Sequence, residues 1–417
     1  RLEEEPQYGL PYVRLPHRPL RDVLVIGAGS GNDVAIALAK GAQHVDAVEI
    51  DPRILQIGRE LNPDHPYQDP RVTTHVTDGR AFLENTHRRY DLVLFALPDS
   101  LALVTGASAI RLESYLFTVQ AVQAARAHVS EHGGFAMYNF YREQWLVQRL
   151  AGTVAAAFGH DPCIDETGRY DEQSVIAVAR RPQDQVCDRR VTLAADRVTP
   201  AADDQPFLYF RGSSLPLRYV VTLALVLLAS LVCVRAAGGP LRGLRGHLDL
   251  FCMGAAFLLL ETRNIATFAL LFGTTWVVNA IVFAGVLVAV LLAVETTRLG
   301  RTPPLPVVYA GIASTLGLAW AVPDSWLLGL PYAARLPVAV ALAFAPVYLA
   351  NIAFSKRFAQ TADSTSAFAV NVLGAMVGGC LEYGALLTGY RALLVVIGAL
   401  YLAAFSLAPK GLRWTAT

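Results

Sequence analysis

Short apolar runs alternate with polar and glycine-rich segments through the first half of the chain. The first run, at 22–26, ends in a glycine turn, and a helical stretch from Asp33 to Lys40 and a second apolar run at 44–50 follow it. A strand, a turn, a helix and a strand in this order form one βαβ unit of a parallel sheet. Further strands are predicted at 72–76, 92–96, 134–138, 163–164 and 174–178, and a helix at 115–128. The pattern predicts a doubly wound α/β domain.

Long apolar stretches replace these short runs after residue 216. A helix needs about 20 apolar residues to cross a hydrocarbon core roughly 30 Å thick. Residues 264–294 contain no charged side chain, and this segment is too long for one ordinary soluble helix. Stretches of about the required length lie at 219–234, 250–272, 276–294, 306–322, 336–354, 367–388 and 392–407. We predict an all-α domain with six or seven transmembrane spans.

The change of pattern also predicts the domain boundary. Residues 1–206 form the predicted α/β domain, and residues 217–417 form the predicted transmembrane domain. Residues 181–216 lose their periodicity and contain four prolines, which is typical of a linker. We interpret them as the linker and its approach to the membrane.

Charged residues are distributed unevenly between the two parts. The whole chain has 54% hydrophobic and 17% charged residues, whereas soluble domains carry about 25% charge. Residues 216–417 contain 13 basic and 6 acidic side chains, and the first 215 residues contain 22 and 28. The net charge of +1 therefore conceals an acidic half and a basic half. This composition excludes a single globular enzyme, a disordered chain and a nucleic-acid binder with a broad basic face.

The cysteines and histidines predict no metal site. Cys163, Cys187, Cys233, Cys252 and Cys380 are widely spaced and form no CxxC pair. Their spacing therefore suggests neither a zinc site nor a disulfide framework. We interpret them as small buried hydrophobic residues in a reducing compartment.

The sequence GAGSGN, at 27–32, lies directly between a predicted strand and a predicted helix. Gly27, Gly29 and Gly31 permit a tight turn and let a ligand approach the backbone at a helix N-terminus. Glu49 ends the second strand about 20 residues later, where an acid can accept hydrogen bonds from both hydroxyls of a ribose. A solvated acid at the end of a strand is the alternative. The glycines alone do not separate dinucleotide enzymes from methyltransferases.

A further acid follows the third predicted strand. Asp78 and Gly79 begin the segment DGRAFL, with Phe82 close behind. A carboxylate at this place can accept a hydrogen bond from the exocyclic amine of an adenine, and an ordinary Asx turn is the alternative. With the glycine turn and Glu49, Asp78 predicts a site for an adenosine-containing ligand.

Five segments together resemble the spermidine synthases, or polyamine aminopropyltransferases: GAGSGN, VEID (48–51), DPRV (69–72), DGRAFL (78–83) and YDLVLF (90–95). That family is a branch of the class I S-adenosylmethionine-dependent methyltransferase fold. The resemblance covers roughly residues 20–180. The segments at 96–118, 203–210 and 371–379 are similar to a bacterial subgroup in which such a domain is fused to membrane helices.

The resemblance implies a ligand and residues that bind it. The ligand is S-adenosylmethionine or its decarboxylated form, used as a substrate without a metal ion. The three glycines of the turn and Gly79 would lie against the nucleoside, Glu49 would bind the ribose and Asp78 the adenine.

The resemblance also implies a catalytic carboxylate. In the family, the fourth strand ends in a motif of the form DSSDP, whose first Asp helps to deprotonate the attacking amine and whose second helps to hold the polyamine. The matching stretch here begins with Ala96 and keeps Asp99 alone. An amine with a pKa near 10 is a nucleophile only after it loses a proton, so a nearby carboxylate matters. Asp99 is the predicted catalytic residue, and Ala96 weakens the prediction of aminopropyl transfer.

Arg111, Glu113 and Tyr115 follow Asp99 at a distance that a loop over the pocket could supply. They are predicted substrate contacts, with a helix N-terminus carrying solvated charges as the alternative.

Two further features lie within the apolar half. Glu261, Arg263 and Glu382 stand inside apolar stretches, where charge is expensive, so they indicate either a functional cavity or buried structural contacts. Gly374 and Gly378 form a GxxxG motif, which permits close helix packing. We interpret this motif as packing within one chain.

Three classes of function fit these features. The first is a membrane-bound transferase that moves an aminopropyl group to an amine. The second is a methyltransferase that acts on a lipid or another membrane-borne acceptor. The third is a transporter or sensor whose soluble domain binds a nucleoside without catalysis. The partners are a small amine or lipid acceptor and the membrane, with no nucleic acid, and homo-oligomerisation stays open.

The charges of the predicted loops bear on orientation. If all seven stretches cross, the basic loops lie opposite the soluble domain, and the positive-inside rule places that domain outside the cytoplasm. Sulfonium cofactors are made inside the cell. We therefore expect a bacterial inner-membrane protein whose soluble domain is cytoplasmic and in which one early segment, Leu250–Phe272, does not fully cross.

Overall fold

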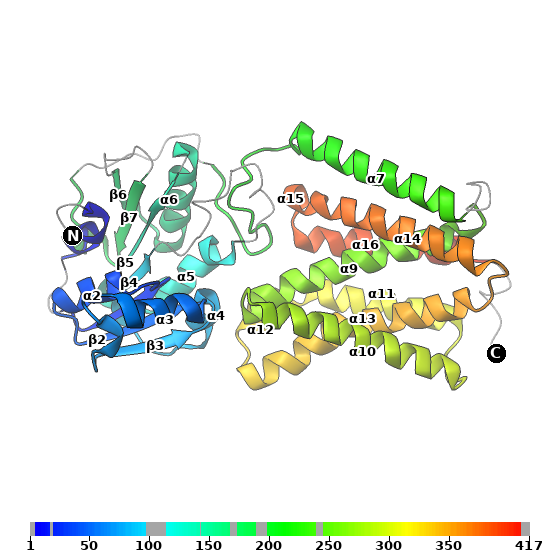
Figure 1. Cartoon of the computed structure of the whole chain (residues 1–417), viewed down its shortest axis with the longest axis horizontal. Coiled ribbons are helices and arrows are strands. Elements are labelled where there is room, and N and C mark those ends of the chain that lie inside the picture. Colours follow the sequence, from blue (N-terminus) through cyan, green and yellow to red (C-terminus); the bar gives the residue numbers. More distant parts are fainter. Residues whose placement is uncertain are drawn as a thin grey trace. The chain divides into compact units, whose positions relative to one another are not determined.

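The computed structural model of the chain describes residues 5–16, 20–96, 114–141, 143–166, 173–188, 198–238 and 245–409. The chain divides into two units, each described by itself below (Figure 1). Unit 1 comprises residues 1–211 together with 273–275. Unit 2 comprises residues 212–272 and 276–417.

A seven-stranded sheet forms the centre of unit 1, in the order β3-β2-β1-β4-β5-β7-β6. Strands β1 to β5 pair in parallel, and β7 runs antiparallel to both β5 and β6. The strands are β1 (Asp22–Ile26), β2 (His44–Glu49), β3 (Val72–Val76), β4 (Tyr90–Ala96), β5 (Val129–Phe140), β6 (Cys163–Glu166) and β7 (Gln173–Ala179). This order confirms the predicted doubly wound α/β fold.

Both faces of the sheet are buried, because successive side chains of a strand point to opposite faces. Leu24 and Ile26 belong to one hydrophobic cluster, and Val23 and Val25 belong to another. The helices are α1 (Leu10–Arg14), α2 (Asn32–Ala39), α3 (Pro52–Leu61), α4 (Gly79–Asn85), α5 (Val119–Ala127) and α6 (Gln144–Phe158), and the 3₁₀ turns are η1 (Pro6–Tyr8), η2 (Pro66–Gln68), η4 (Tyr115–Phe117) and η5 (Pro182–Asp184).

The single helix predicted at 115–128 is interrupted at Thr118. The Thr118 side chain accepts a hydrogen bond from the backbone of Ala121 (3.2 Å) and so caps the N-terminus of α5. The preceding turn, η4, is therefore separate from α5, and it contributes Tyr115 to the site described below.

Residues 198–211 belong to unit 1 and contact its helices. Asp203 accepts hydrogen bonds from Thr118 (2.5 Å) and Arg80 (3.3 Å). Arg149 on α6 donates to the backbone oxygens of Phe207 (3.2 Å) and Leu208 (2.6 Å). The second half of the predicted linker thus packs against the α/β unit.

Cys163 and Cys187 form a disulfide with their Cα atoms 5.2 Å apart. The prediction that the cysteines form no disulfide is therefore wrong for these two. They are 24 residues apart, a spacing that matches no sequence motif. The fold brings them together because β6 begins at Cys163, and Gln185, two residues before Cys187, donates to the backbone of Asp161 (3.0 Å).

Unit 2 consists of helices. Six of those described are long and apolar enough to cross a membrane, by length and composition, and α11 is a shorter apolar helix. The helices are α7 (Leu217–Gly238), α9 (Leu248–Phe272), α10 (Trp276–Arg298), α11 (Leu305–Ala321), α12 (Asp324–Leu328), α13 (Tyr332–Phe358), α14 (Ser364–Leu381), α15 (Ala385–Thr388) and α16 (Tyr390–Leu407), with turns η6 (Arg245–His247) and η7 (Glu382–Gly384). Leu250–Phe272 lies in the continuous helix α9, and its failure to cross stays a prediction.

Small residues allow α9 and α14 to touch. A Cβ atom added at Gly374 would lie 2.0 Å from the backbone oxygen of Phe251, and one at Gly378 would lie 2.4 Å from that of Ala255. The GxxxG motif therefore packs within one chain, as predicted. Of the charged residues in apolar stretches, Arg263 and Glu382 are buried and Glu261 is half-buried.

Contacts between helix ends define two ends of unit 2. At one end, Tyr219 near the start of α7 lies against Tyr383 (5.9 Å between ring centroids). At the other end, Lys356 donates to the backbone of Pro303 (2.8 Å), and Arg357 forms a buried ion pair with Asp249.

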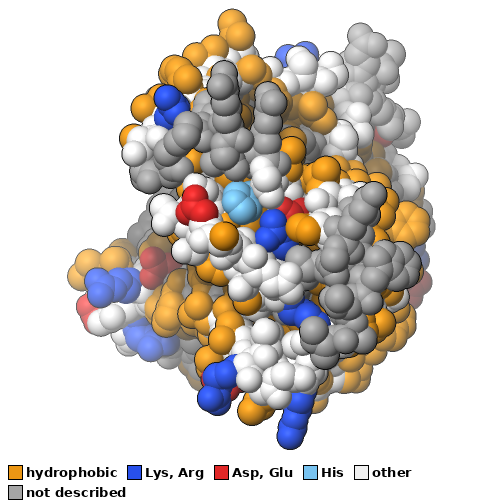
Figure 2. Space-filling view, turned by 90° about the vertical axis from the view of Figure 1, so that its right-hand side faces the viewer, with side chains coloured by type: hydrophobic (Ala, Val, Ile, Leu, Met, Phe, Trp, Pro, Cys, Tyr) orange, Lys and Arg blue, Asp and Glu red, His pale blue; other side chains and the backbone are white. Residues whose placement is uncertain are grey.

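Basic side chains are more numerous at the second end, which we call the basic end of unit 2, while Arg218, Arg335 and Arg391 lie near the first end. Figure 2 shows lysine and arginine side chains among hydrophobic ones on a face of the molecule. Those that the helix ends place at the basic end are Arg235, Arg298, Arg301, Lys356 and Arg357. Helix α7 begins at Leu217, at the opposite end of unit 2.

Candidate functional site

The glycine turn connects β1 to α2. Gly27, Gly29 and Gly31 have φ values of +78°, +54° and +93°, a region that favours glycine. A Cβ atom at Gly31 would also lie 2.7 Å from the ring of Pro66. Tyr67 holds the turn by donating its hydroxyl to the backbone oxygens of Ala28 (3.0 Å) and Gly29 (2.8 Å).

Glu49 lies at the end of β2, beside this turn. Its Oε2 accepts a hydrogen bond from the amide of Gly29 (2.9 Å), and its Oε1 accepts one from the amide of Asp51 (3.0 Å). The side chain is buried, with 7% exposed. A carboxylate has about four acceptor positions, so Glu49 can position the turn and still accept hydrogen bonds from a ligand.

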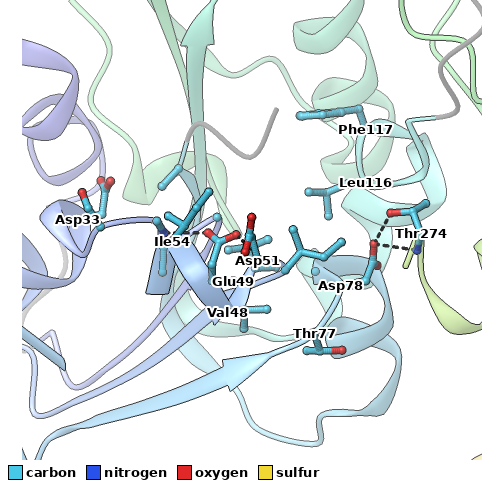
Figure 3. Close-up of a pocket in the computed structure, with 18 of the residues that line it drawn as sticks. Asp33, Val48, Glu49, Asp51, Ile54, Thr77, Asp78, Leu116, Phe117 and Thr274 are labelled. Carbon is cyan, nitrogen blue, oxygen red and sulfur yellow. Dashed lines mark hydrogen bonds between the residues drawn. The ribbon is translucent and has the colours of Figure 1, made fainter. Parts of the chain in front are cut away.

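Asp78 lies before α4 and caps it. Its Oδ1 accepts a hydrogen bond from the amide of Ala81 (3.0 Å). Its Oδ2 accepts hydrogen bonds from the amide (3.3 Å) and hydroxyl (2.9 Å) of Thr274, which belongs to unit 1 (Figure 3). Gly79 follows directly, and a Cβ atom there would lie 2.4 Å from the side chain of Ile26. The carboxylate is therefore both a helix cap and part of the cavity wall.

One cavity of about 640 Å³ brings these residues together. This volume is within the usual range for small-molecule sites. Of the predicted site residues, those in its lining are Gly27, Gly29, Glu49, Asp78, Gly79 and Tyr115. Gly31 is the N-cap of α2 and is not among the lining residues. Asp99, Arg111 and Glu113 lie outside the described residues.

Two further acids, Asp33 and Asp51, line this cavity and were not predicted from the sequence. With Glu49 and Asp78, four carboxylates line the cavity, and the described part of its lining contains no lysine or arginine. In Figure 3, Asp33 lies at one end of the site, Asp78 at the other, and Glu49 and Asp51 between them. Asp51 follows Glu49 in the VEID segment, so its position beside the site could have been expected.

The four carboxylates make the cavity anionic, and the cavity lies at the N-terminus of α2. No group of three residues suited to hold a metal ion is found in the part of the chain that the structure describes. The cavity can therefore accept hydrogen-bond donors and cationic groups along its length.

Residues 10–158 match the family model for the spermine/spermidine synthase domain. The matched segment lies within unit 1. It includes β1 to β5 and the whole glycine turn. The predicted resemblance to this family is confirmed.

Curated relatives match parts of the chain. The polyamine aminopropyltransferase of Lachnoclostridium phytofermentans is 33% identical over 93 residues, which are 22% of this chain and 33% of that protein. The polyamine aminopropyltransferase 1 of Pseudomonas aeruginosa is 29% identical over 123 residues, which are 28% of this chain and 40% of that protein. This chain spans two fifths or less of the length of these two relatives.

Solved structures are similar at lower identity. The spermidine synthase from Thermotoga maritima is 16% identical with a TM-score of 0.36, over 52% of this chain and 74% of that one. Human methyltransferase-like protein 13 is 18% identical with a TM-score of 0.34, over 43% of this chain and 82% of that one.

Proposed function

We propose that unit 1 transfers an aminopropyl group from decarboxylated S-adenosylmethionine to a small amine. The cavity lining, with four carboxylates and no cationic side chain among its described residues, is the observation that supports this function. The sulfonium donor and a protonated amine are both cations, and an anionic cavity raises their local concentration. The match to the synthase family supports the same reaction.

In the proposed reaction, the nitrogen of the amine attacks the aminopropyl carbon next to sulfur. A carbon–nitrogen bond forms, the carbon–sulfur bond breaks, and methylthioadenosine leaves as a neutral thioether. The amine loses one proton. Glu49 binds the ribose hydroxyls, Asp78 binds the adenine amine, and Asp99 assists removal of the proton.

The test uses the full-length chain in detergent, decarboxylated S-adenosylmethionine and 1,4-diaminobutane. We expect release of methylthioadenosine that requires the diamine. A parallel reaction contains S-adenosylmethionine and membrane lipid. Methyl transfer to lipid in that reaction, without methylthioadenosine in the first, would replace the proposed function by the methyltransferase alternative.

Glu49→Ala should weaken nucleoside binding about tenfold or more. The variant removes the acceptor for the ribose hydroxyls and for two backbone amides in a buried place, and an unpaired buried polar group costs about 1–3 kcal/mol. Calorimetry with methylthioadenosine measures the effect. Glu60→Ala, on the exposed face of α3, is the matched control. Wild-type affinity in both Glu49→Ala and Asp78→Ala would contradict this assignment.

Two observations favour a second function, a nucleoside-binding sensor or transporter domain outside the cytoplasm. The disulfide in unit 1 is a feature of oxidising compartments. In addition, α7, the first helix of unit 2, begins opposite the basic end, and the positive-inside rule places basic loops in the cytoplasm. Both observations oppose a cytoplasmic position for unit 1.

Thiol labelling in intact cells decides between the two functions. Cysteine replaces Ser214, in a chain whose Cys233, Cys252 and Cys380 are changed to serine, and the cells receive a membrane-impermeant reagent before and after lysis. Protection of position 214 until lysis supports the cytoplasmic transferase. Labelling in intact cells excludes transfer with a cytoplasmic donor and supports the second function. A cysteine at Thr302, in the loop that contacts Lys356, reports on the basic end.

A further inference from the structure

Asp33 is a buried carboxylate in the wall of the cavity. It lies in the first turn of α2, two residues after Gly31, and only 8% of it is exposed. Its Oδ2 accepts a hydrogen bond from the hydroxyl of Tyr138 (2.6 Å). Among the described residues, no lysine, arginine or histidine forms an ion pair with Asp33.

Aromatic side chains from separate elements surround this carboxylate. Tyr138 comes from β5, and its ring lies edge-on to that of Tyr8 in η1, with 6.0 Å between the centroids. Tyr8 itself lines the cavity. Tyr12 on α1 and Tyr67 on η2 interact electrostatically with Asp33. Asp33 lies at the end of the cavity away from Asp78 (Figure 3), and its interactions with these tyrosines link it to η1, α1, η2 and β5.

Lys40 lies over the ring of Tyr12 (5.8 Å to the centroid), but in the described structure no cationic side chain pairs with the Asp33 carboxylate. A carboxylate taken out of water without a positive partner is unfavourable, and burial raises the pKa of Asp33 to about 6. The faces of aromatic rings attract ammonium groups, as they do in other ammonium-binding cages. The neighbouring strand contributes no charge here, because Ala96 is the register partner of Tyr138 and also lines the cavity.

We propose that Asp33, with Tyr8 and Tyr138, binds a primary ammonium group of a substrate. This inference rests on the proposed transferase function and adds to it a residue that determines specificity. Asp33 is the binding group, and Tyr138 is a positioning residue that acts through the Asp33 carboxylate. The ammonium group comes either from the amine acceptor or from the aminopropyl chain of the sulfonium donor.

The site predicts a pH dependence of ammonium binding. The groups that face Asp33 in the described structure are Tyr8, Tyr12, Tyr67 and Tyr138, and burial raises the pKa of each of the last three, so they stay neutral near pH 6. Ionised Asp33 is the form that binds a cation. Affinity should therefore rise as pH increases through about 6, and should be about tenfold weaker at pH 5 than at pH 7.5.

Asp33→Asn is the direct test, in full-length protein in detergent at pH 7.5. Calorimetry measures three probes: 1,4-diaminobutane in the presence of methylthioadenosine, decarboxylated S-adenosylmethionine, and methylthioadenosine alone. We expect at least a tenfold loss of affinity for one of the two ammonium probes and unchanged affinity for methylthioadenosine, which has no ammonium group. Loss for the diamine identifies the acceptor as the source of the ammonium, and loss for the sulfonium compound identifies the donor.

Tyr138→Phe gives a second readout that a merely structural role would not produce. Removing the hydroxyl takes a hydrogen bond from the ionised carboxylate, so the pH midpoint of ammonium binding should move upward. Asp64→Asn, an exposed acid outside the cavity, is the charge-matched control. If Asp33→Asn does not bind methylthioadenosine, the test rests on Tyr138→Phe. An upward shift of its pH midpoint for ammonium binding supports the ammonium site, and an unchanged midpoint contradicts it.

The inference and the proposed function can fail separately. If both ammonium probes bind Asp33→Asn with wild-type affinity and no pH dependence near 6, the ammonium site is wrong even if transfer occurs. If no amine releases methylthioadenosine from the wild type, transfer is wrong, while Asp33-dependent binding would still show the ammonium site.

Discussion

Replacing Gly374 by alanine will destabilise unit 2, although alanine favours a helix over glycine by about 1 kcal/mol. The added Cβ atom would lie 2.0 Å from the backbone oxygen of Phe251 on α9, and a backbone atom cannot move aside as a flexible side chain can. Overpacking of this kind costs typically about 1–3 kcal/mol and sometimes more. The same interface contains Gly254, where a Cβ atom would lie 2.1 Å from the backbone oxygen of Asn371. We expect α9 and α14 to move apart and unit 2 to unfold at a lower temperature than in the wild type.

Thermal unfolding and the monodisperse fraction in detergent measure this effect. Gly398→Ala, on α16, is the matched control, because nothing lies within 4 Å of a Cβ atom at that position. It should leave stability unchanged or raise it through helix propensity. Equal unfolding temperatures for Gly374→Ala and Gly398→Ala would contradict the close contact between α9 and α14.

Asp99→Asn will remove most aminopropyl transfer, by about 100-fold in kcat, while nucleoside affinity stays close to wild type. General-base assistance contributes typically about 10²–10⁴-fold, and an amine with a pKa near 10 needs it at neutral pH. Ala96, which ends β4, has no carboxylate to supply this assistance. Asp99, three residues later, is the one acid of the family motif that this sequence keeps, and it is therefore the predicted general base.

Kinetics separate this effect from that of Asp33. Asp99→Asn should lower kcat with little change in KM for the amine, whereas Asp33→Asn should raise KM if the acceptor carries the ammonium group. Methylthioadenosine release measures both parameters, and Asp64→Asn is again the control. Normal turnover in Asp99→Asn would make this acid a structural residue and would favour a nucleoside-binding domain without catalysis.

Local pattern was enough to predict the strands of unit 1. Each core strand is a short apolar run next to a turn, and both the run and the turn are properties of adjacent residues. The predicted strand at 72–76 agrees with β3, and the run at 22–26 agrees with β1. The helix predicted at 115–128 was wrong at Thr118, because a threonine inside an apolar pattern gives no sign that its side chain will cap a new helix.

The nucleoside end of the site was also accessible from the sequence. In a parallel sheet the carboxyl ends of neighbouring strands lie at one edge, so residues that follow β1, β2 and β3 must lie near one another. Glu49 ends β2, Gly29 and Asp78 come just after β1 and β3, and all three line the cavity.

The features that only the tertiary structure decided depend on contacts between distant segments. In the sequence, Asp33 has the features of an ordinary helix residue. Only the fold places Tyr138 of β5, which is 105 residues away in sequence, against its carboxylate. Cys163 and Cys187 match no motif. They form a disulfide because the segment around Gln185 packs beside the start of β6. A sequence determines a hydrophobic period or a turn locally, whereas the burial and partner of one polar side chain depend on which other elements pack against it.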